Sequence, residues 1–170
     1  PASSSLIAEK LKLKATCLDV NSACSSFVSN LMVASSLLRD SHFSTAYLCN
    51  VERYTLRLNY KERGNCILFG DGAAITELST EKQAASFEIL DLYLKSDASG
   101  ALTVHIPMDD LFYQDGARVQ KFAISKTCEA ANELMNRNKI LSSDLKYFVG
   151  HQANLRMLSK ACEILNIGTG

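Results

Sequence analysis

No charged side chain occurs between Asp19 and Arg39, and this feature constrains the fold more than any other part of the sequence. A helix that spans a membrane needs about 20 predominantly apolar residues. Apolar residues do recur here at helical spacing, at Phe27, Leu31 and Leu38. Polar residues interrupt the segment repeatedly, at Asn21, Ser22, Ser25, Ser26, Ser29, Asn30, Ser35 and Ser36. We therefore predict a helix over residues 22–39 that is buried inside a large soluble protein.

The whole chain has the composition of a soluble globular protein. It has 170 residues, of which 47% are apolar and 21% charged, and its formal net charge is zero. This length is enough for one domain with a buried core. Because there is no basic excess, we expect no nucleic-acid partner and no membrane partner. The chain has no secretory signal peptide and begins at Pro1, so we expect a central fragment of a longer protein.

The six cysteines are widely spaced, and none forms a CxxC pair. They are Cys17, Cys24, Cys49, Cys66, Cys128 and Cys162. Disulfide frameworks are typical of short secreted chains, and zinc sites need closely spaced ligand pairs. We therefore predict no metal site, and we interpret most of these cysteines as small buried apolar groups in a reducing compartment.

Helical and strand patterns alternate along the chain. Helical spacing predicts helices over residues 2–13, 22–39, 119–137 and 153–165. Compact apolar or alternating runs predict strands over residues 16–20, 45–51, 65–69, 73–78, 87–94 and 145–149. Gly70, Asp71 and Gly72 are expected to form a tight turn that joins the strands over 65–69 and 73–78 as a hairpin. This order is typical of layered α/β proteins.

Cys24 lies at the junction between a predicted strand and a predicted helix. The first turn of a helix has unpaired N–H groups and the positive end of the helix dipole. This environment favours a thiolate, which is a nucleophile. Small neighbours such as Ala23 and Ser25 leave room for an acyl group. On the local sequence alone, however, a small packing residue is the better explanation of Cys24.

His151 lies at a second junction of the same kind, after the predicted strand over 145–149. A histidine can exchange a proton near neutral pH. Considered alone, a hydrogen-bonded structural histidine fits this position better. We assign His42 and His105 to surface or structural roles. A cysteine and a distant histidine together fit a cysteine hydrolase as well as an acyltransferase.

Four segments, taken together, resemble motifs of the β-ketoacyl-acyl-carrier-protein synthase III family. Residues 19–27 (DVNSACSSF) are similar to its nucleophile segment, and residues 150–154 (GHQAN) to its histidine motif. Residues 68–74 (LFGDGAA) resemble its glycine turn, and residues 116–123 (GARVQKFA) resemble the start of a helix in its second half. The four segments occur in the family's order and at its approximate spacing.

This resemblance implies a thiolase-like fold of the α/β class, with layered αβαβα architecture built from two similar halves. Residues 1–85 would supply the rest of the first half with the nucleophile. Residues 86–170 would supply the start of the second half with the catalytic histidine. The resemblance also implies a homodimer, and we expect it in the cytoplasm.

The resemblance further implies an acyltransferase that initiates fatty-acid biosynthesis. Cys24 would take an acyl group from acyl-CoA and condense it with malonyl-acyl-carrier protein, with loss of CO2, to give 3-ketoacyl-acyl-carrier protein. His151 would stabilise negative charge on the malonyl thioester. Arg63 matches an arginine that contacts the CoA nucleotide, Asn154 a residue near the pantetheine arm, and Arg156 a basic position for carrier-protein docking. The CoA thioester is a substrate, and no permanently bound cofactor is expected.

The chain departs from the family pattern at several positions. The family's third catalytic residue, an asparagine, would lie beyond Gly170. Ser26 and Ala74 stand where the family often has glycine, and Gln120 where it often has an apolar residue. We expect these changes to narrow the acyl pocket or to mark a divergent branch.

Other functions stay open at this point. A related thiolase-fold acyltransferase of secondary metabolism would use the same Cys24–His151 pair with another acceptor. A non-catalytic thiolase-fold subunit would not use the pair at all. A cysteine hydrolase does not explain four ordered motifs. We also expect a piece of such a fold to expose sheet edges, and therefore to fold poorly and lack condensing activity by itself.

Overall fold

The computed structural model describes residues 2–40, 43–84, 86–108 and 111–168. The chain divides into two compact units. Unit 1 comprises Pro1–Glu52 and Gly72–Phe87, and unit 2 comprises Arg53–Asp71 and Glu88–Gly170. His42 lies outside the described residues. The division into similar halves over 1–85 and 86–170 stays a prediction.

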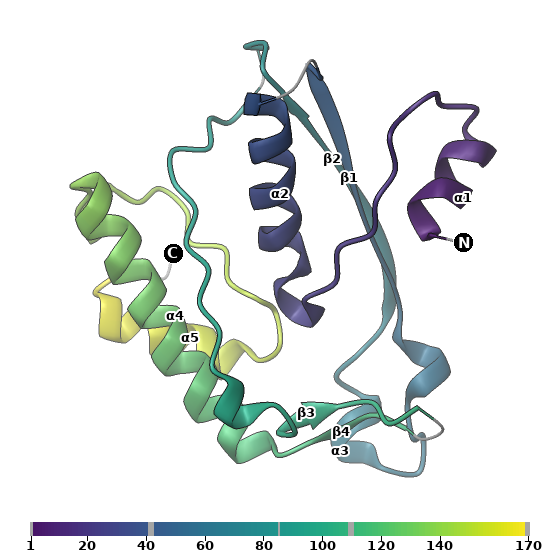
Figure 1. The fold of residues 1–170 in the computed structure, drawn as a ribbon. Helices are drawn as coiled ribbons and strands as arrows, with labels where there is room; N and C mark the ends of the chain where they lie inside the picture. The colour runs from purple at the N-terminus through teal and green to yellow at the C-terminus, as the bar shows by residue number, and fades with distance from the viewer. Residues whose placement is uncertain (1, 41–42, 85, 109–110, 169–170) are drawn as a thin grey trace. The chain divides into compact units, whose positions relative to one another are not determined.

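Unit 1 contains two helices and a pair of strands among its described residues. α1 spans Ser3–Lys10, and α2 spans Ser26–Asp40. β1 (Thr45–Arg53) pairs with β2 (Asp71–Ser79), as Figure 1 shows. The backbone N–H of residue 80 donates to the carbonyl of residue 44 at 3.0 Å, which joins the start of β1 to the end of β2. The two strands therefore run antiparallel.

The core of unit 1 lies between α2 and these two strands. Leu31, Ala34 and Leu38 follow helical spacing and form one stripe of α2. They pack with Leu48 of β1 and Leu78 of β2, which are 5% and 8% exposed. Among the described residues, α2 is thus buried along one face, whereas large apolar side chains off this stripe remain exposed.

Unit 2 is built around α4 (Gly116–Asn138) and α5 (Leu155–Leu165), which pack side by side (Figure 1). Their contact buries Cys128, Ala161 and Leu165, around which Ile124, Ala131, Met135, Phe148 and Ile167 pack. Ala161 is 1% exposed, and its small side chain allows the two helices to approach closely. Burial, and secondly the neighbouring Cys162, raise the pKa of the Cys128 thiol.

The other elements of unit 2 are short. They are 3-10 turns over Tyr54–Arg57, Ala98–Gly100 and Ser142–Asp144, the helix α3 (Arg63–Cys66), and the strands β3 (Val104–His105) and β4 (Tyr113–Gln114). β3 and β4 pair antiparallel, with His105 opposite Tyr113. The Phe69 ring lies 4.9 Å from that of Tyr54 and 4.7 Å from that of Phe112, between ring centroids. These aromatic contacts attach residues 53–71 to the rest of unit 2.

Four of the predicted strands are wrong. Residues 16–20, 87–94 and 145–149 form no strand, and residues 65–69 begin inside α3. Their composition suits a strand, but a strand also needs a neighbour whose backbone groups complete the hydrogen-bond ladder. The part of the chain that the structure describes places no strand beside them.

The tight turn predicted at residues 70–72 is also wrong. Asp71 and Gly72 open β2, and neither Gly70 nor Gly72 has a positive φ. The Asp71 carboxylate instead accepts hydrogen bonds from the Thr55 hydroxyl at 2.6 Å and the Thr55 N–H at 2.9 Å. The bond from the Thr55 hydroxyl lowers the pKa of Asp71 most, and the bond from the Thr55 N–H lowers it further. The hairpin-like pair exists, but β1 and β2 form it.

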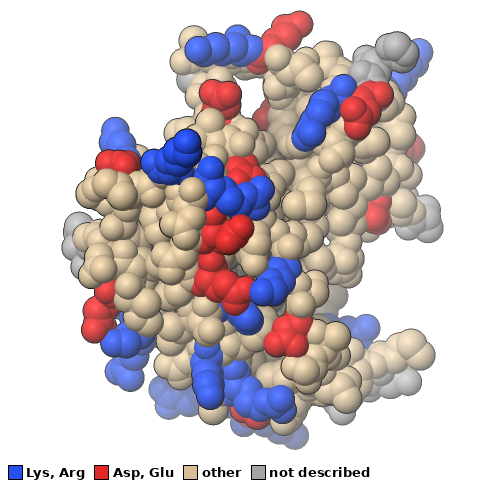
Figure 2. Space-filling view, turned by 60° about the vertical axis from the view of Figure 1, so that its left-hand side comes forward, with Lys and Arg blue, Asp and Glu red and all other residues tan. Residues whose placement is uncertain are grey.

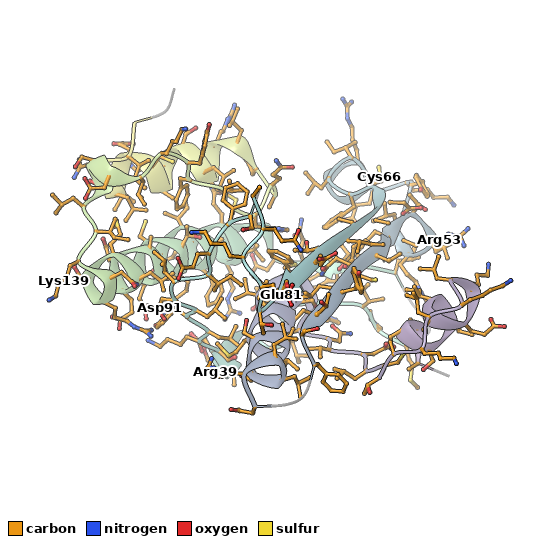
Figure 3. All side chains as sticks on the ribbon, turned by 90° about the horizontal axis from the view of Figure 1, so that it is seen from above. Arg39, Arg53, Cys66, Glu81, Asp91 and Lys139 are labelled. Carbon is orange, nitrogen blue, oxygen red and sulfur yellow. The ribbon has the colours of Figure 1, made fainter. Side chains whose placement is uncertain are left out.

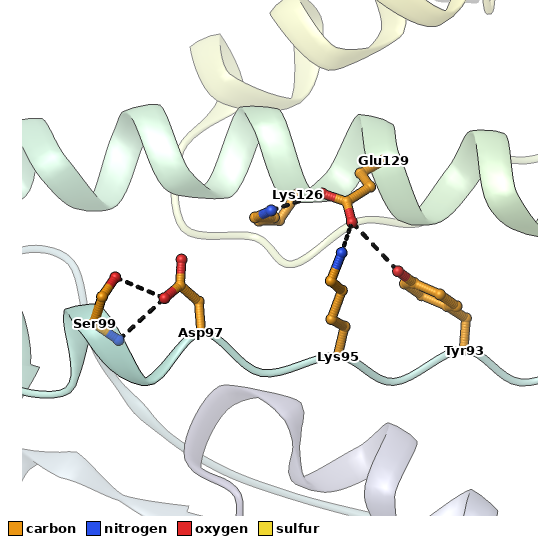
Figure 4. Close-up of polar contacts among 6 residues, drawn as sticks. All are labelled: Tyr93, Lys95, Asp97, Ser99, Lys126 and Glu129. Atoms are coloured by element: carbon orange, nitrogen blue, oxygen red, sulfur yellow. Dashed lines mark hydrogen bonds and ion pairs between the residues drawn. The ribbon is translucent and has the colours of Figure 1, made fainter.

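Glu129 of α4 holds a neighbouring extended segment of unit 2 against the helix (Figure 4). Its carboxylate pairs with Lys95 and, at 2.6 Å, with Lys126. It also accepts a hydrogen bond of 3.4 Å from the Tyr93 hydroxyl. Hydrogen bonds from Lys126 and then Lys95 lower the pKa of Glu129 to about 2.

The same segment has a second polar attachment to α4, at Asp91 (Figure 3). The Asp91 carboxylate pairs with Arg137 at 2.7 Å and accepts a hydrogen bond from the Asn138 side chain at 3.1 Å. We call the contacts of Asp91, Tyr93, Lys95, Lys126, Glu129, Arg137 and Asn138 the ionic seam. Figure 2 shows acidic and basic side chains interspersed on one face of the molecule, in keeping with the zero net charge.

Replacing Glu129 by alanine should release residues 93–97 from α4, because the contacts of Glu129 with Lys95 and with Tyr93 are lost together. Amide hydrogen exchange of these residues should then become faster. The pKa of Glu129 falls from 4.5 to about 2 on folding, so its contribution to stability is complete above about pH 4.5 and disappears as the pH falls through 2. Glu133→Ala, one turn further along α4, is the control. Unchanged amide hydrogen exchange of residues 93–97 in Glu129→Ala would show that Glu129 does not hold this segment against α4.

Candidate active site

Cys24 lies in a 3-10 turn, Ala23–Ser25, that leads directly into α2, and it is exposed. The Ser25 N–H donates to the Ser22 carbonyl at 3.1 Å and closes this turn. We predicted Cys24 in the first turn of the helix itself. The structure corrects this by a few residues, because α2 begins only at Ser26.

The backbone of the turn is strained at the residue before the cysteine. Ala23 has a φ of 49°, in the left-handed region. A residue with a Cβ pays about 1–3 kcal/mol for such a conformation, so surrounding contacts must maintain it. The Ala23 N–H donates to Oδ1 of Asn21 at 2.9 Å. The Ser26 hydroxyl accepts from the Ser22 N–H at 3.0 Å and donates to the Ala23 carbonyl at 2.7 Å.

A buried serine anchors the same turn to the body of α2. The hydroxyls of Ser22 and Ser29 lie 2.6 Å apart, and Ser29 is 7% exposed. Sequence reasoning missed the part that Asn21, Ser22, Ser26 and Ser29 play here. The available signal was their residue type, since asparagine and serine readily bond to nearby backbone groups.

His151 lies in the loop that leads into α5, and it is exposed. The Ala153 N–H donates to the His151 carbonyl at 2.9 Å. Before it, Phe148 packs against the cluster between α4 and α5. Gly150 lies so close to α5 that an added Cβ would stand 2.3 Å from Cδ2 of Leu158. The loop around His151 is thus held by packing before the histidine and by a hydrogen bond after it.

Asn154 is the N-cap of α5. Its Oδ1 accepts a hydrogen bond from the Arg156 N–H at 2.8 Å, and its φ of −163° is extended. From the sequence, a cap was the alternative to a binding role for Asn154, and asparagine before an apolar periodic run is a helix start signal. Arg156 is exposed in the first turn of α5, and Arg63 is exposed at the start of α3.

The predicted site residues are divided between the two units. Cys24 belongs to unit 1, and Arg63, His151, Asn154 and Arg156 belong to unit 2. Three of these, His151, Asn154 and Arg156, lie within one loop and the helix start that follows it. The pairing of Cys24 with His151 stays a prediction.

The cysteines are less buried than we predicted. Cys128 and Cys162 are buried, whereas Cys17, Cys49 and Cys66 are half-buried and Cys24 is exposed. Among the described residues, no group of three or more histidine, cysteine or acidic side chains is arranged to hold a metal ion. No helix in the described ranges has the length and apolar character needed to cross a bilayer.

Comparisons with known proteins point to one group of enzymes. The family described as 3-oxoacyl-[acyl-carrier-protein] synthase III matches residues 18–98. The β-ketoacyl-[acyl-carrier-protein] synthase III of Clostridium kluyveri is 29% identical over 98% of this chain and 55% of its own length. That of Rickettsia canadensis is 32% identical over 88% of this chain and 49% of its own length. The chain spans about half the length of the curated relatives it matches.

The solved structures agree with this relationship. The 3-oxoacyl-(acyl carrier protein) synthase III of Pseudomonas aeruginosa matches with a TM-score of 0.91 and 27% identity, over 99% of this chain and 54% of that one. The fold is therefore that of the thiolase-like α/β condensing enzymes, as predicted. Within that class, the chain is similar to the β-ketoacyl-acyl-carrier-protein synthase III family, in agreement with the motif resemblance.

Asn154→Ala should lower the free energy of unfolding by about 1 kcal/mol, because the Arg156 N–H loses its cap. Asn154→Asp keeps an acceptor at the same position and should stay within a few tenths of a kcal/mol of the unchanged protein. Chemical denaturation of the full-length protein measures both. Equal stability of the alanine and aspartate variants would contradict the capping role.

Proposed function

We propose that the full-length protein is a β-ketoacyl-acyl-carrier-protein synthase III-like acyltransferase of fatty-acid initiation. The observation that carries the proposal is similarity to this family over nearly the whole chain, including the segments of both Cys24 and His151. The exposed position of Cys24 in a turn before α2 supports it, because an acyl donor can reach the thiol there.

In the first half-reaction, the Cys24 sulfur attacks the thioester carbon of an acyl-CoA. A new C–S bond forms to Cys24 and the C–S bond to CoA breaks. CoA leaves as its thiol, with the proton that the Cys24 thiol gives up. Cys24 lies just before the first turn of α2, and the N–H groups and dipole of that turn favour negative charge on the nearby sulfur.

In the second half-reaction, malonyl-acyl-carrier protein loses its carboxylate as CO2, and the electron pair of the broken C–C bond stays on the α carbon. That carbanion attacks the acyl-Cys24 carbonyl. A C–C bond forms, and the sulfur of Cys24 leaves as the thiolate. His151 donates a hydrogen bond to the malonyl thioester oxygen, where negative charge develops during decarboxylation.

Three further residues of unit 2 bind the substrates in this proposal. Arg63 contacts the CoA nucleotide as an exposed cation at the start of α3. Asn154 uses Oδ1 to cap α5, so its amide N–H groups would donate to the pantetheine arm. Arg156 docks the acidic carrier protein. A shallow hollow on α5, lined by Leu155, Arg156, Ser159, Lys160 and Glu163, supports the docking role.

The proposal includes the setting in which the enzyme works. It acts as a homodimer in the cytoplasm, with acyl-CoA and malonyl-acyl-carrier protein as its two substrates. CoA passes through as part of a substrate, and catalysis needs no permanently bound cofactor, because the thiol of Cys24 carries the acyl group between the half-reactions.

Incubation of the full-length protein with acetyl-CoA and longer acyl-CoAs should add one acyl mass, mapped by peptide to Cys24. The Cys24→Ala variant should acquire no adduct, since the acceptor sulfur is missing. Cys17→Ala, on the same segment, is the matched control and should still be acylated. An adduct that persists in Cys24→Ala, or no adduct with any acyl-CoA, would contradict the proposal.

His151→Ala should separate the two half-reactions. The variant should still form the acyl-Cys24 adduct but release CO2 from malonyl-acyl-carrier protein about 100-fold more slowly, the usual cost of losing one donor to a developing oxyanion. Radiolabelled malonyl-acyl-carrier protein measures this release. Acylation without any CO2 release in the unchanged protein would show simple acyl transfer and contradict the condensation step.

A further inference from the structure

The turn that carries Cys24 contains a hydroxyl bridge that the reaction described above does not use. The Ser26 hydroxyl accepts a hydrogen bond from the Ser22 N–H at 3.0 Å and donates one to the Ala23 carbonyl at 2.7 Å. One side chain thus satisfies backbone groups on both sides of the peptide that joins residues 22 and 23. Ser26 itself is half-buried.

The two hydrogen bonds of the bridge lie on either side of Ala23, the residue before the cysteine, whose backbone is strained. Ala23 has a φ of 49°, and an alanine leaves this region readily unless its neighbours oppose the change. Rotation of Ala23 toward ordinary values would turn its carbonyl away from the Ser26 hydroxyl. The same rotation would redirect Cys24, because it moves the chain on which the cysteine is the next residue.

Two additional contacts fix the bridge relative to α2. Oδ1 of Asn21 holds the Ala23 N–H at 2.9 Å, and the Ser22 hydroxyl lies 2.6 Å from that of the buried Ser29. Ser29 is part of α2, so the turn cannot shift along the helix without breaking that contact. Within this network, Ser26 is the side chain that contacts the backbone on both sides of the strained residue.

We propose that Ser26 is a positioning residue for Cys24, whose hydroxyl bridge holds Ala23 in the left-handed conformation and so aims the sulfur at the acyl donor. This inference rests on the proposed function, in which Cys24 accepts the acyl group. Ser26 would act through the backbone, because its hydroxyl bonds to the Ser22 N–H and the Ala23 carbonyl. Its removal should therefore affect the rate of acyl transfer and leave the binding of acyl-CoA unchanged.

Ser26→Ala in the full-length protein should lower the maximal rate of Cys24 acylation by acetyl-CoA about five- to ten-fold, the effect expected for one or two lost hydrogen bonds. The acetyl-CoA concentration at half-maximal rate should not change. Ser26→Thr keeps the hydroxyl and should retain the rate. Ser36→Ala is the matched control, because the Ser36 hydroxyl also bonds to the backbone of α2, at Met32, but away from the turn.

A second variant tests the backbone argument directly. Glycine adopts a positive φ without the steric cost that alanine bears. Ala23→Gly should therefore restore part of the acylation rate when combined with Ser26→Ala. No recovery in the double variant, or an acylation rate for Ser26→Ala within two-fold of the unchanged protein, would overturn the positioning role.

Amide hydrogen exchange separates failure of this inference from failure of the proposed function, because it needs no acyl-CoA. The Ser22 amide should exchange faster in Ser26→Ala than in Ser36→Ala, since only the first variant removes its acceptor. If the Ser22 amide exchanges faster in Ser26→Ala but acetyl-CoA acylates neither this variant nor the unchanged protein, the hydroxyl bridge exists and the acyl-transfer function is rejected. Unchanged exchange at Ser22 would reject the bridge itself.

Discussion

Burial of one stripe of α2 against the inner face of β1 and β2 is the contact on which the nucleophile segment depends. Leu38 of the helix and Leu48 and Leu78 of the strands are each less than a tenth exposed. Fully burying such a side chain contributes about 1.5–3 kcal/mol. Because this contact fixes the body of α2, the position of its first residue, Ser26, is fixed as well. The Ser26 and Ser29 hydroxyls then transmit that position to the turn that carries Cys24.

In unit 2, packing between two helices fixes the position of the His151 loop in a similar way. Ala161, at 1% exposure, allows α5 to lie close against α4, and Phe148 joins the cluster from the loop. The His151 loop therefore begins on one packed side chain and ends at the Asn154 cap of α5. Polar contacts complete the unit, since the ionic seam joins an extended segment to α4. In both units, a packed helix positions the residue that we assign to catalysis.

The helices were predictable because each has an apolar stripe with helical period. Residues 22–39, 119–137 and 153–165 were all predicted as helices, and α2, α4 and α5 lie within a few residues of those bounds. The strands over 45–51 and 73–78 were right for a related reason, since Leu48 and Leu78 had a helix to pack against. Residues 87–94 and 145–149 have similar composition, but strand formation depends on partners far along the sequence, which local patterns do not reveal.

The roles of the candidate site residues stay predictions, and the local geometry around them was only partly predictable. The motif around Cys24 predicted a nucleophile at the start of a helix, and the structure places an exposed cysteine in a turn just before α2. The positive φ of Ala23 was not predictable, because contacts from Asn21 and Ser26 impose it on a residue that does not favour it. Pairing of Cys24 with His151 likewise depends on two segments far apart in sequence.

The central claim of the proposal is that Cys24 and His151 serve the same reaction, Cys24 by holding the acyl group and His151 by acting on the malonyl thioester that condenses with it. A crystal structure of the full-length protein after reaction with an acyl-CoA tests this most directly. The account predicts electron density for an acyl group joined to the Cys24 sulfur, with the His151 ring facing that group across the space that the malonyl thioester would occupy. An unmodified Cys24, or a His151 ring directed away from the acylated sulfur, would contradict it.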